Sequence, residues 1–251
     1  MTARQRPRRS SPLYLPSAFD LFRPSRDLIL NHISTFGPLY VLPLFFWLHS
    51  WSWIPASGGH YWFRFSDANY SLSAFPTAYF QAFVGFSILW FVLAIAFGTL
   101  IQIMLQRAQL DAVGHKRLDL AELWGIARAF GPRMFGLYAI VGLLVGGGVL
   151  LALAVSPIFY ILVIPGLIML RRYLFAPYVM LDIKCSIMEA MDGSAALSNI
   201  NRGSVWGIIG VIALIGLVGL VPIVGSLAAF ILGALYSAAP ALRYQQLKKL
   251  A

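Results

Sequence analysis

The densest polar stretch of this 251-residue chain lies between residues 171 and 204. It holds four cationic and three anionic side chains, so its charges nearly balance. Side chains of these types suit the binding of an anionic group or of a partner protein. The alternative interpretation is a network that only clamps the chain locally. The candidate site residues are Arg107, Arg128, Arg171, Arg172, Asp182, Glu189, Ser194 and Arg202.

A catalytic or metal centre needs ionisable or nucleophilic side chains in a group, and the long apolar runs of this chain contain almost none. His32, His49, His60 and His115 show neither the His-x-x-His nor the His-Glu-x-x-His spacing of metal sites. No Walker loop for a nucleotide phosphate is present. The single Cys185 excludes an internal disulfide and a cysteine-rich metal site. We therefore predict that the protein is not an enzyme and has no catalytic residues, cofactor or metal.

The composition is that of a membrane protein. Apolar residues make up 59% of the chain and charged residues only 11%, whereas soluble domains carry roughly 25% charged residues. The net charge of +10 raises the question of nucleic-acid binding. The basic residues, however, stand at predicted helix ends and in short loops, where anionic lipid headgroups neutralise them. We predict anionic membrane lipids as partners at the cytoplasmic face, and no nucleic acid.

The basic residues also predict an orientation. Of the 19 Lys and Arg residues, 18 fall in four segments that alternate with the apolar runs and share one side of the membrane, and only Arg64 falls on the other side. Loops rich in Lys and Arg remain cytoplasmic. We therefore expect a multi-pass protein of the bacterial cytoplasmic (inner) membrane with both termini in the cytoplasm.

The predicted fold is all-α, a bundle of six transmembrane helices arranged as three hairpins in one domain over residues 17–245. Most spans approach the roughly 20 residues that cross the hydrocarbon core. A disordered basic cytoplasmic tail is expected at 1–16 and a second basic tail at 246–251. An aromatic external loop over 54–76 is expected to lie on the outer membrane surface, with a ligand-binding lid as the alternative. The predicted spans cover about 36–53, 77–105, 134–155, 158–174, 204–221 and 223–242.

A short interfacial helix is expected on the cytoplasmic side before each hairpin. Asp119 with Glu122, and Ser186 with Glu189, have the three-residue spacing of a capping box, in which each side chain satisfies a free backbone donor. Before the first hairpin we expect Ser25 to begin the helix, without an acidic partner. Apolar residues at helical spacing over 119–130 and 186–200 favour helices that lie in the membrane interface.

Proline and glycine predict where the helices bend and touch. The breaker Phe130-Gly131-Pro132 is expected to separate the second interfacial helix from its span. Pro165 and Gly166 are expected to kink the fourth span, since neighbouring helices satisfy the freed carbonyl. The run Gly146–Gly148 lies inside an apolar span, where small residues permit close helix contact. Such faces serve packing within the chain or, alternatively, a homo-oligomer.

One stretch resembles a known family. It runs from Pro165-Gly166 through residues 172–182 (RYLFAPYVMLD) to residues 186–194 (SIMEAMDGS). It is similar to a broad bacterial family of uncharacterised six-helix integral membrane proteins, related to the membrane domain fused to some glycerophosphodiester phosphodiesterases. The resemblance implies the fold and the inner-membrane location. It implies no activity, because the phosphodiesterase domain is absent from this sequence.

These observations favour a non-enzymatic membrane protein with a role in scaffolding or in lipid or partner association. One alternative is a small transporter or permease component whose path passes Pro165 and Gly146–Gly148. A second alternative is an accessory that presents lipid to an envelope enzyme. A transporter should have a polar-lined cavity, a scaffold should have a dry core of small residues, and a lipid presenter should hold anionic lipid at Arg171, Arg172 and Arg202.

Overall fold

The computed structural model describes residues 15–41, 77–117, 119–154, 157–219, 221 and 224–251, and this part of the chain is helical, with no strands. Residues 1–14 of the tail predicted at 1–16, the first predicted span beyond residue 41 and the aromatic loop lie outside the described residues. Helix α1 (Phe22–Asn31) is followed by a helical stretch at 33–41. Helix α3 (Thr77–Val113) and helix α4 (Leu120–Ala154) come next.

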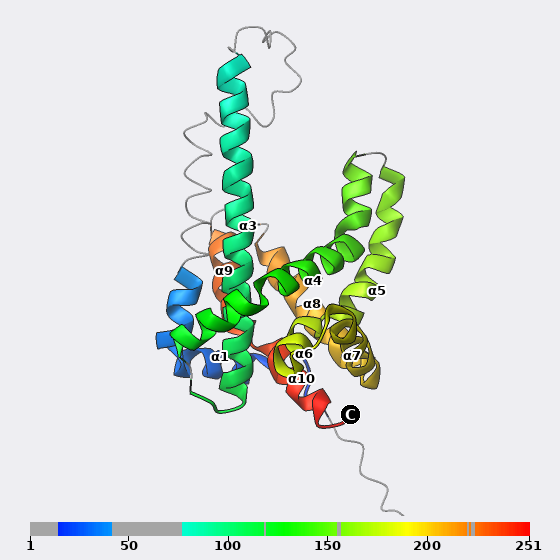
Figure 1. Ribbon diagram of the computed structural model, residues 1–251. Coiled ribbons are helices and arrows are strands. Elements are labelled where there is room, and N and C mark those ends of the chain that lie inside the picture. The colour runs from blue at the N-terminus through cyan, green and yellow to red at the C-terminus, as the bar shows by residue number, and fades with distance from the viewer. Residues whose placement is uncertain (1–14, 42–76, 118, 155–156, 220, 222–223) are drawn as a thin grey trace, which may run out of the picture.

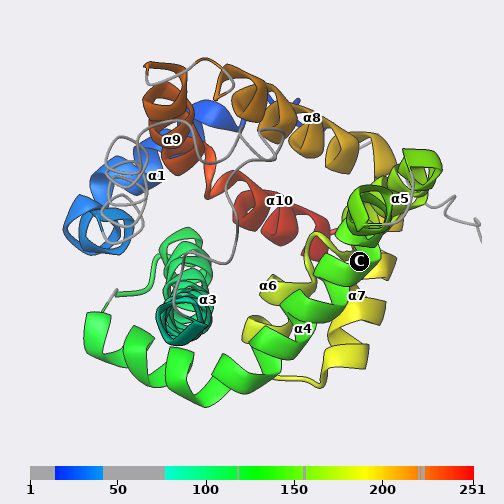
Figure 2. The same ribbon diagram turned by 90° about the horizontal axis from the view of Figure 1, so that it is seen from above.

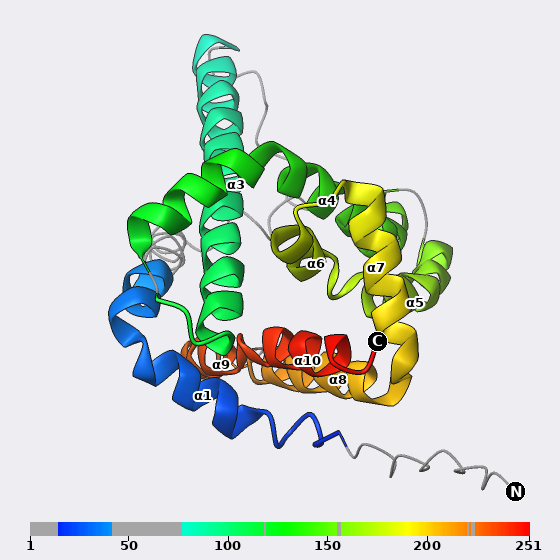
Figure 3. The same ribbon diagram turned by 60° about the horizontal axis from the view of Figure 1, so that its bottom comes forward.

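The long helices and the short helices occupy different ends of the molecule. In Figure 1, α3 and the top of α4 project upward, whereas α1, α6 (Ala176–Ile183), α7 (Ile187–Ile200) and α10 (Ala239–Lys248) lie at the bottom. Viewed from above, α6 and α10 lie inside a ring formed by the other helices (Figure 2). The C-terminus ends beside α7 (Figure 3).

Helix α3 is longer than the span predicted for it. Its 37 residues rise about 55 Å at roughly 1.5 Å per residue, well beyond the roughly 30 Å of bilayer hydrocarbon. The helix therefore extends past the predicted boundary at Leu105. This extension carries Arg107 and Asp111, which form an ion pair one helical turn apart.

The predicted break before the third span is wrong. Helix α4 runs continuously from Leu120 to Ala154 with Pro132 inside it. Proline removes the bond to the carbonyl four residues earlier, here that of Arg128. Arg128 and Pro132 are both exposed, so this carbonyl lies on a face where solvent or lipid headgroups replace the missing partner.

The fourth span begins in a tighter helix than expected. Residues Pro157–Leu162 form a 3-10 helix that continues into α5 (Val163–Tyr173). Pro165 therefore lies in the first turn of α5, where a missing N–H costs no hydrogen bond. The helix type changes just before the predicted kink at Pro165 and Gly166, and the α-helix continues through both residues.

Helix α6 lies at the centre of the core, in a region between residues 174 and 186 for which the sequence predicted no helix. All six residues from Ala176 to Leu181 are buried. Helix α6 packs on α3, α4 and α7. It begins with Pro177 in its first turn and ends at Lys184, whose left-handed backbone (φ 59°) lets its N–H bond the carbonyl of Met180. A largely apolar helix of this length is stable only because α3, α4 and α7 cover its buried residues.

A sharp turn separates α7 from the helix that follows it. Helices α7 and α8 (Arg202–Val218) meet at 103°. Asn201 makes the turn and caps α8, since its Oδ1 accepts a hydrogen bond of 3.0 Å from the N–H of Ser204. Helix α9 (Val224–Tyr236) packs back on α8 and leads to α10.

Within the described residues, three helical segments are long and apolar enough to cross a membrane, and the bent α7–α8 pair makes up to four. The three are Leu120–Val149, Val163–Ile183 and Val224–Lys248. Only 11% of the apolar window in Leu120–Val149 is buried within the protein. A helix that is both apolar and exposed requires lipid or another protein around it. The chain is therefore a helical membrane protein, with its dense core at the end formed by α6, α7 and α10.

Candidate functional site

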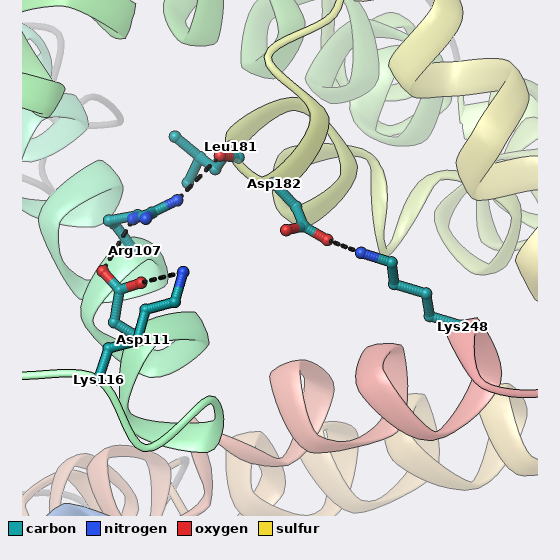
Figure 4. Close-up of polar contacts among 6 residues, drawn as sticks. All are labelled: Arg107, Asp111, Lys116, Leu181, Asp182 and Lys248. Atoms are coloured by element: carbon teal, nitrogen blue, oxygen red, sulfur yellow. Dashed lines mark hydrogen bonds and ion pairs between the residues drawn. The ribbon is translucent and has the colours of Figure 1, made fainter.

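The predicted charged cluster is divided among separate structural contacts. Arg107 donates from Nε to Asp111 Oδ2 (2.8 Å) and from Nη1 to the carbonyl of Leu181 (3.1 Å). Asp182 accepts from Lys248 Nζ (2.6 Å) and from the hydroxyl of Tyr244 (2.7 Å). Figure 4 shows the contacts of Arg107 and the Asp182–Lys248 pair as two groups, of which the first ties α6 to α3 and the second ties α6 to α10. Arg107 and Asp182 therefore stabilise the packing of the core helices.

Ser194 and its neighbour Ser198 join α7 to the end of α5. The hydroxyl of Ser194 donates to the carbonyl of Arg172 (2.8 Å) and accepts from the N–H of Phe175 (3.1 Å). The hydroxyl of Ser198 donates to the carbonyl of Arg171 (3.0 Å). These bonds satisfy backbone groups that the end of α5 leaves free. The clamp interpretation therefore explains the serines of this region.

The remaining members of the predicted cluster do not converge. Arg128, Arg172 and Arg202 are exposed, and Arg172 lies over the ring of Tyr173, 5.8 Å from its centroid. Arg171 is buried, and its Nη1 has no partner in the described part of the chain. Among the eight candidate residues, all of them described, one hydrogen bond joins two members, that from Ser194 to Arg172.

The capping residues behave as the sequence predicts in one case and partly in the other. Ser186 and Glu189 form a complete capping box, with Ser186 N–H donating to Glu189 (2.8 Å) and Glu189 N–H donating to Ser186 (3.4 Å). Asp119 caps α4 by accepting from the N–H of Ala121 (2.9 Å). Within the described residues Glu122 returns no bond to Asp119, and it lines a pocket of about 280 Å³ with Arg107 and Lys184 instead.

The predicted cap at Ser25 is wrong. Ser25 lies inside α1 and donates to the carbonyl of Leu235 (2.7 Å). The acidic pairing occurs earlier, where Ser17 N–H donates to Asp20 (2.9 Å) and Asp20 N–H donates to Ser17 (3.2 Å). The spacing Ser-x-x-Asp was present in the sequence and is the signal that would have located this turn.

An uncharged hydrogen-bond network lies deeper, between α3 and the helices around it. Tyr138 donates to Gln106 Oε1 (2.6 Å) and Tyr178 donates to Gln109 Oε1 (3.0 Å). Gln109 Nε2 in turn donates to the hydroxyl of Ser237 (3.1 Å). The network joins α3, α4, α6 and the start of α10 through side chains that are neutral at ordinary pH.

A pocket of about 300 Å³ lies above this network. Its polar side consists of Gln102, Gln106, Tyr178 and Ser237. Its opposite wall is apolar and includes Ile212 and Ile215 of α8. Ile212 is 45% exposed, so the apolar wall continues to the lipid-facing surface of α8. The other lining residues are Leu174, Gly233, Tyr236 and Pro240. This shape suits a molecule with one polar end and an apolar body.

Sequence reasoning missed this pocket, although a signal was present. Gln102, Gln106 and Gln109 recur at i, i+4 and i+7 within an otherwise apolar run, which places three amides on one face of a helix. Polar side chains inside a membrane helix mark interactions with other helices or with ligands. Because these amides carry no charge, a pattern of charged residues does not reveal them.

Metal and thiol chemistry find no support in the described part of the chain. No group of three or more His, Cys, Asp and Glu side chains lies close enough there to hold a metal ion. Burial raises the pKa of the Cys185 thiol, which disfavours the nucleophilic thiolate form.

The fold and this pocket define the class as an all-helical membrane protein with an amphipathic pocket among its helices. Comparison with family models, with curated proteins and with solved structures gives no match for this chain. Its function must therefore be argued from the pocket.

Proposed function

We propose that the protein binds an amphipathic molecule, taken from the bilayer, in the pocket between α3, α6, α8 and α9. The observation that carries the proposal is the pairing of polar Gln102, Gln106 and Tyr178 with the apolar, lipid-exposed wall at Ile212 and Ile215. A scaffold with a dry core of small residues gives no reason for three amides at this place. The sequence predicts either scaffolding or association with lipid or a partner. Of these roles, lipid association fits the pocket better than scaffolding does.

The proposal includes the predicted topology of six spans in three hairpins in a bacterial inner membrane, with both termini cytoplasmic. The arrangement of α3 and of the α4–α5 hairpin, which project to the same side in Figure 1, supports it. The short helices at the other end would then lie at the cytoplasmic interface. The pocket would open toward the inner half of the bilayer, within reach of lipid or of a lipid-like metabolite.

A transport role is less well supported. Gln109 lies behind Tyr178 and Ser237 and is only 3% exposed, and its hydrogen bonds to both residues close the pocket on its polar side. The pocket therefore has the form of a binding site open to the hydrocarbon.

The test is to identify, by mass spectrometry, the amphiphiles that stay bound to the full chain purified in a mild detergent. Ile212→Trp should fill the pocket and lower the bound amount at least about fivefold, since bulk added to a pocket excludes its ligand. Leu217→Trp is the matched control, because Leu217 is on the same helix, 59% exposed, and lines neither this pocket nor the core. Equal occupancy in the two variants, or no bound amphiphile in the unmodified protein, would refute the proposal.

A further inference from the structure

The polar side of the pocket carries no charge. Its side chains are amides and hydroxyls, from Gln102, Gln106, Tyr178, Tyr236 and Ser237. This composition contrasts with the +10 net charge of the chain and with the anionic lipid partners that the sequence predicts. A ligand seated here meets hydrogen-bonding groups and no counter-ion.

The cationic side chains of the neighbouring helices lie outside the pocket lining. Arg171 and Arg243 are buried, and each keeps at least one guanidinium nitrogen without a partner in the described part of the chain. Arg107 is paired with Asp111 and bound to the carbonyl of Leu181. Arg172 stacks on Tyr173, and Arg243 is fully buried with its Nη2 bonded to the carbonyl of Pro16 (2.6 Å). None of them lines the pocket. A charged headgroup would lose its hydration without gaining a partner there.

The hydroxyl protons of the pocket are already used within the protein. Tyr178 donates to Gln109, Tyr236 donates to the carbonyl of Ala18 (3.0 Å), and Ser237 donates to the carbonyl of Ala234 (2.8 Å). These hydroxyl groups therefore have no proton left to donate to a ligand, and a donor for a ligand oxygen must come from another group.

The free donors are amide N–H groups. Tyr138 occupies the carbonyl of Gln106, and the –NH₂ of Gln106 bonds no other described residue. Gln102 is exposed to this space and makes no hydrogen bond within the described part of the chain. Each glutamine offers two N–H donors. These groups match carbonyl, ester or ether oxygens.

We therefore infer, on the basis of the proposed function, that the ligand is an uncharged amphiphile whose polar end carries carbonyl or ester oxygens. Its oxygens accept from the amides of Gln102 and Gln106, and its apolar body lies along Ile212 and Ile215. A volume of about 300 Å³ is at the lower limit of small-molecule sites. The pocket therefore holds the polar end and the first part of the chain, and the rest extends past Ile212 into the bilayer.

The test compares two probes that differ by one phosphate. The full chain is equilibrated with vesicles containing equal amounts of dioleoylglycerol and dioleoylphosphatidic acid, and the bound lipids are counted by native mass spectrometry. The expected result is a preference for dioleoylglycerol of about tenfold or more, because the phosphate has no counter-charge in the pocket. Gln106→Leu should remove most of this binding, and Gln245→Leu, on α10 and outside the pocket, should leave it unchanged.

A second variant keeps the test independent of folding defects. Gln102→Lys adds a cation at an exposed position of the pocket and should shift the preference toward dioleoylphosphatidic acid. If the unmodified protein prefers the phosphatidic acid, the inference on charge is overturned while the proposed function stands. If neither probe binds and Ile212→Trp changes nothing, the proposed function itself fails.

Discussion

Gly166 lies directly against the backbone of Val145, so that a Cβ at position 166 would overlap the Val145 carbonyl oxygen. Gly148 makes a similar approach, since a Cβ there would lie 2.6 Å from the Cβ of Leu162. In lipid the hydrophobic effect does not drive apolar helices together, because lipid tails are as apolar as the side chains. Helix pairs there gain stability from close van der Waals packing instead. The α4–α5 hairpin therefore depends on glycine at these two positions.

We expect Gly166→Ala to lower the free energy of unfolding by about 1–3 kcal/mol, the usual cost of adding atoms to a filled interface. Gly146→Ala and Gly147→Ala should be neutral, because a Cβ at either position meets nothing within 4 Å. Unfolding of the purified variants in detergent, followed by circular dichroism, measures the difference. Equal destabilisation at positions 146 and 166 would contradict the explanation by close contact.

Asp182 should contribute more to stability than its ion pair with Lys248 implies. The Lys248 side chain is 48% exposed, and exposed ion pairs contribute about 0–1 kcal/mol. The hydroxyl of Tyr244, a residue only 1% exposed, also depends on Asp182 as its acceptor, and a buried group left without a partner costs about 1–3 kcal/mol. Asp182→Ala should therefore destabilise the protein by about 1–3 kcal/mol and Lys248→Met by less than about 1 kcal/mol, measured by the same unfolding experiment.

The sequence predicted the helical class and several local signals, but the core escaped it. The turn at Asn201 and the capping box of Ser186 with Glu189 follow from short-range hydrogen bonding, which spacing reveals. Helix α6 does not, because Ala176–Leu181 is stable as a helix only when α3, α4 and α7 surround it. Pro132 was predicted to break the helix, but α4 continues through it, because the exposed face of α4 tolerates a missing hydrogen bond. This outcome too depends on the surroundings of the helix, which the sequence does not show.

The candidate site shows the same limit. Charged residues are conspicuous in a sequence with 11% charge, yet Arg107 and Asp182 serve the core. Their partners, the carbonyl of Leu181 and the hydroxyl of Tyr244, lie far away in the sequence. The pocket requires Gln106 to meet Tyr138 and Gln109 to meet Tyr178, and only the folded chain brings these residues together.

Arg243 is a destabilising charge in the present structure. It is 0% exposed, and its Nε and Nη1 have no partner in the described part of the chain. A buried charge without a counter-ion costs free energy that an apolar side chain of similar size avoids. We expect Arg243→Met to raise the free energy of unfolding by about 1–2 kcal/mol and Arg243→Ala to lower it, since alanine leaves a cavity. A loss of stability in Arg243→Met would contradict this expectation and show that the hydrogen bond from Nη2 to the carbonyl of Pro16 outweighs the cost of the buried charge.

The turn before α1 should weaken in acid. The hydroxyl and the backbone N–H of Ser17 lower the pKa of Asp20, so the folded state favours the ionised carboxylate. A lowered pKa contributes stability above the ordinary value for aspartate, and this contribution is lost as the pH falls through the lowered folded-state pKa. The unfolding midpoint of the unmodified protein should approach that of Asp20→Asn between about pH 5 and pH 2. Ser17→Ala removes the hydroxyl but keeps the backbone N–H that donates to Asp20, so it should reduce the pH dependence only in part. A constant gap between the unmodified protein and Asp20→Asn at all pH values would contradict this role.

The orientation of the chain is tested by fusions on either side of α3. The basic end of α3 at Arg107 and the segment that follows it, with Lys116 and Arg117, should stay in the cytoplasm because the membrane potential and anionic lipids oppose their translocation. A periplasmic reporter such as alkaline phosphatase should therefore be active when fused after Tyr70 and inactive when fused after Lys116, and a cytoplasmic reporter should give the opposite pattern. Activity of the periplasmic reporter after Lys116 would invert the topology. The pocket of Gln102 and Gln106 would then face the outer half of the bilayer, and its ligand would have to come from that leaflet.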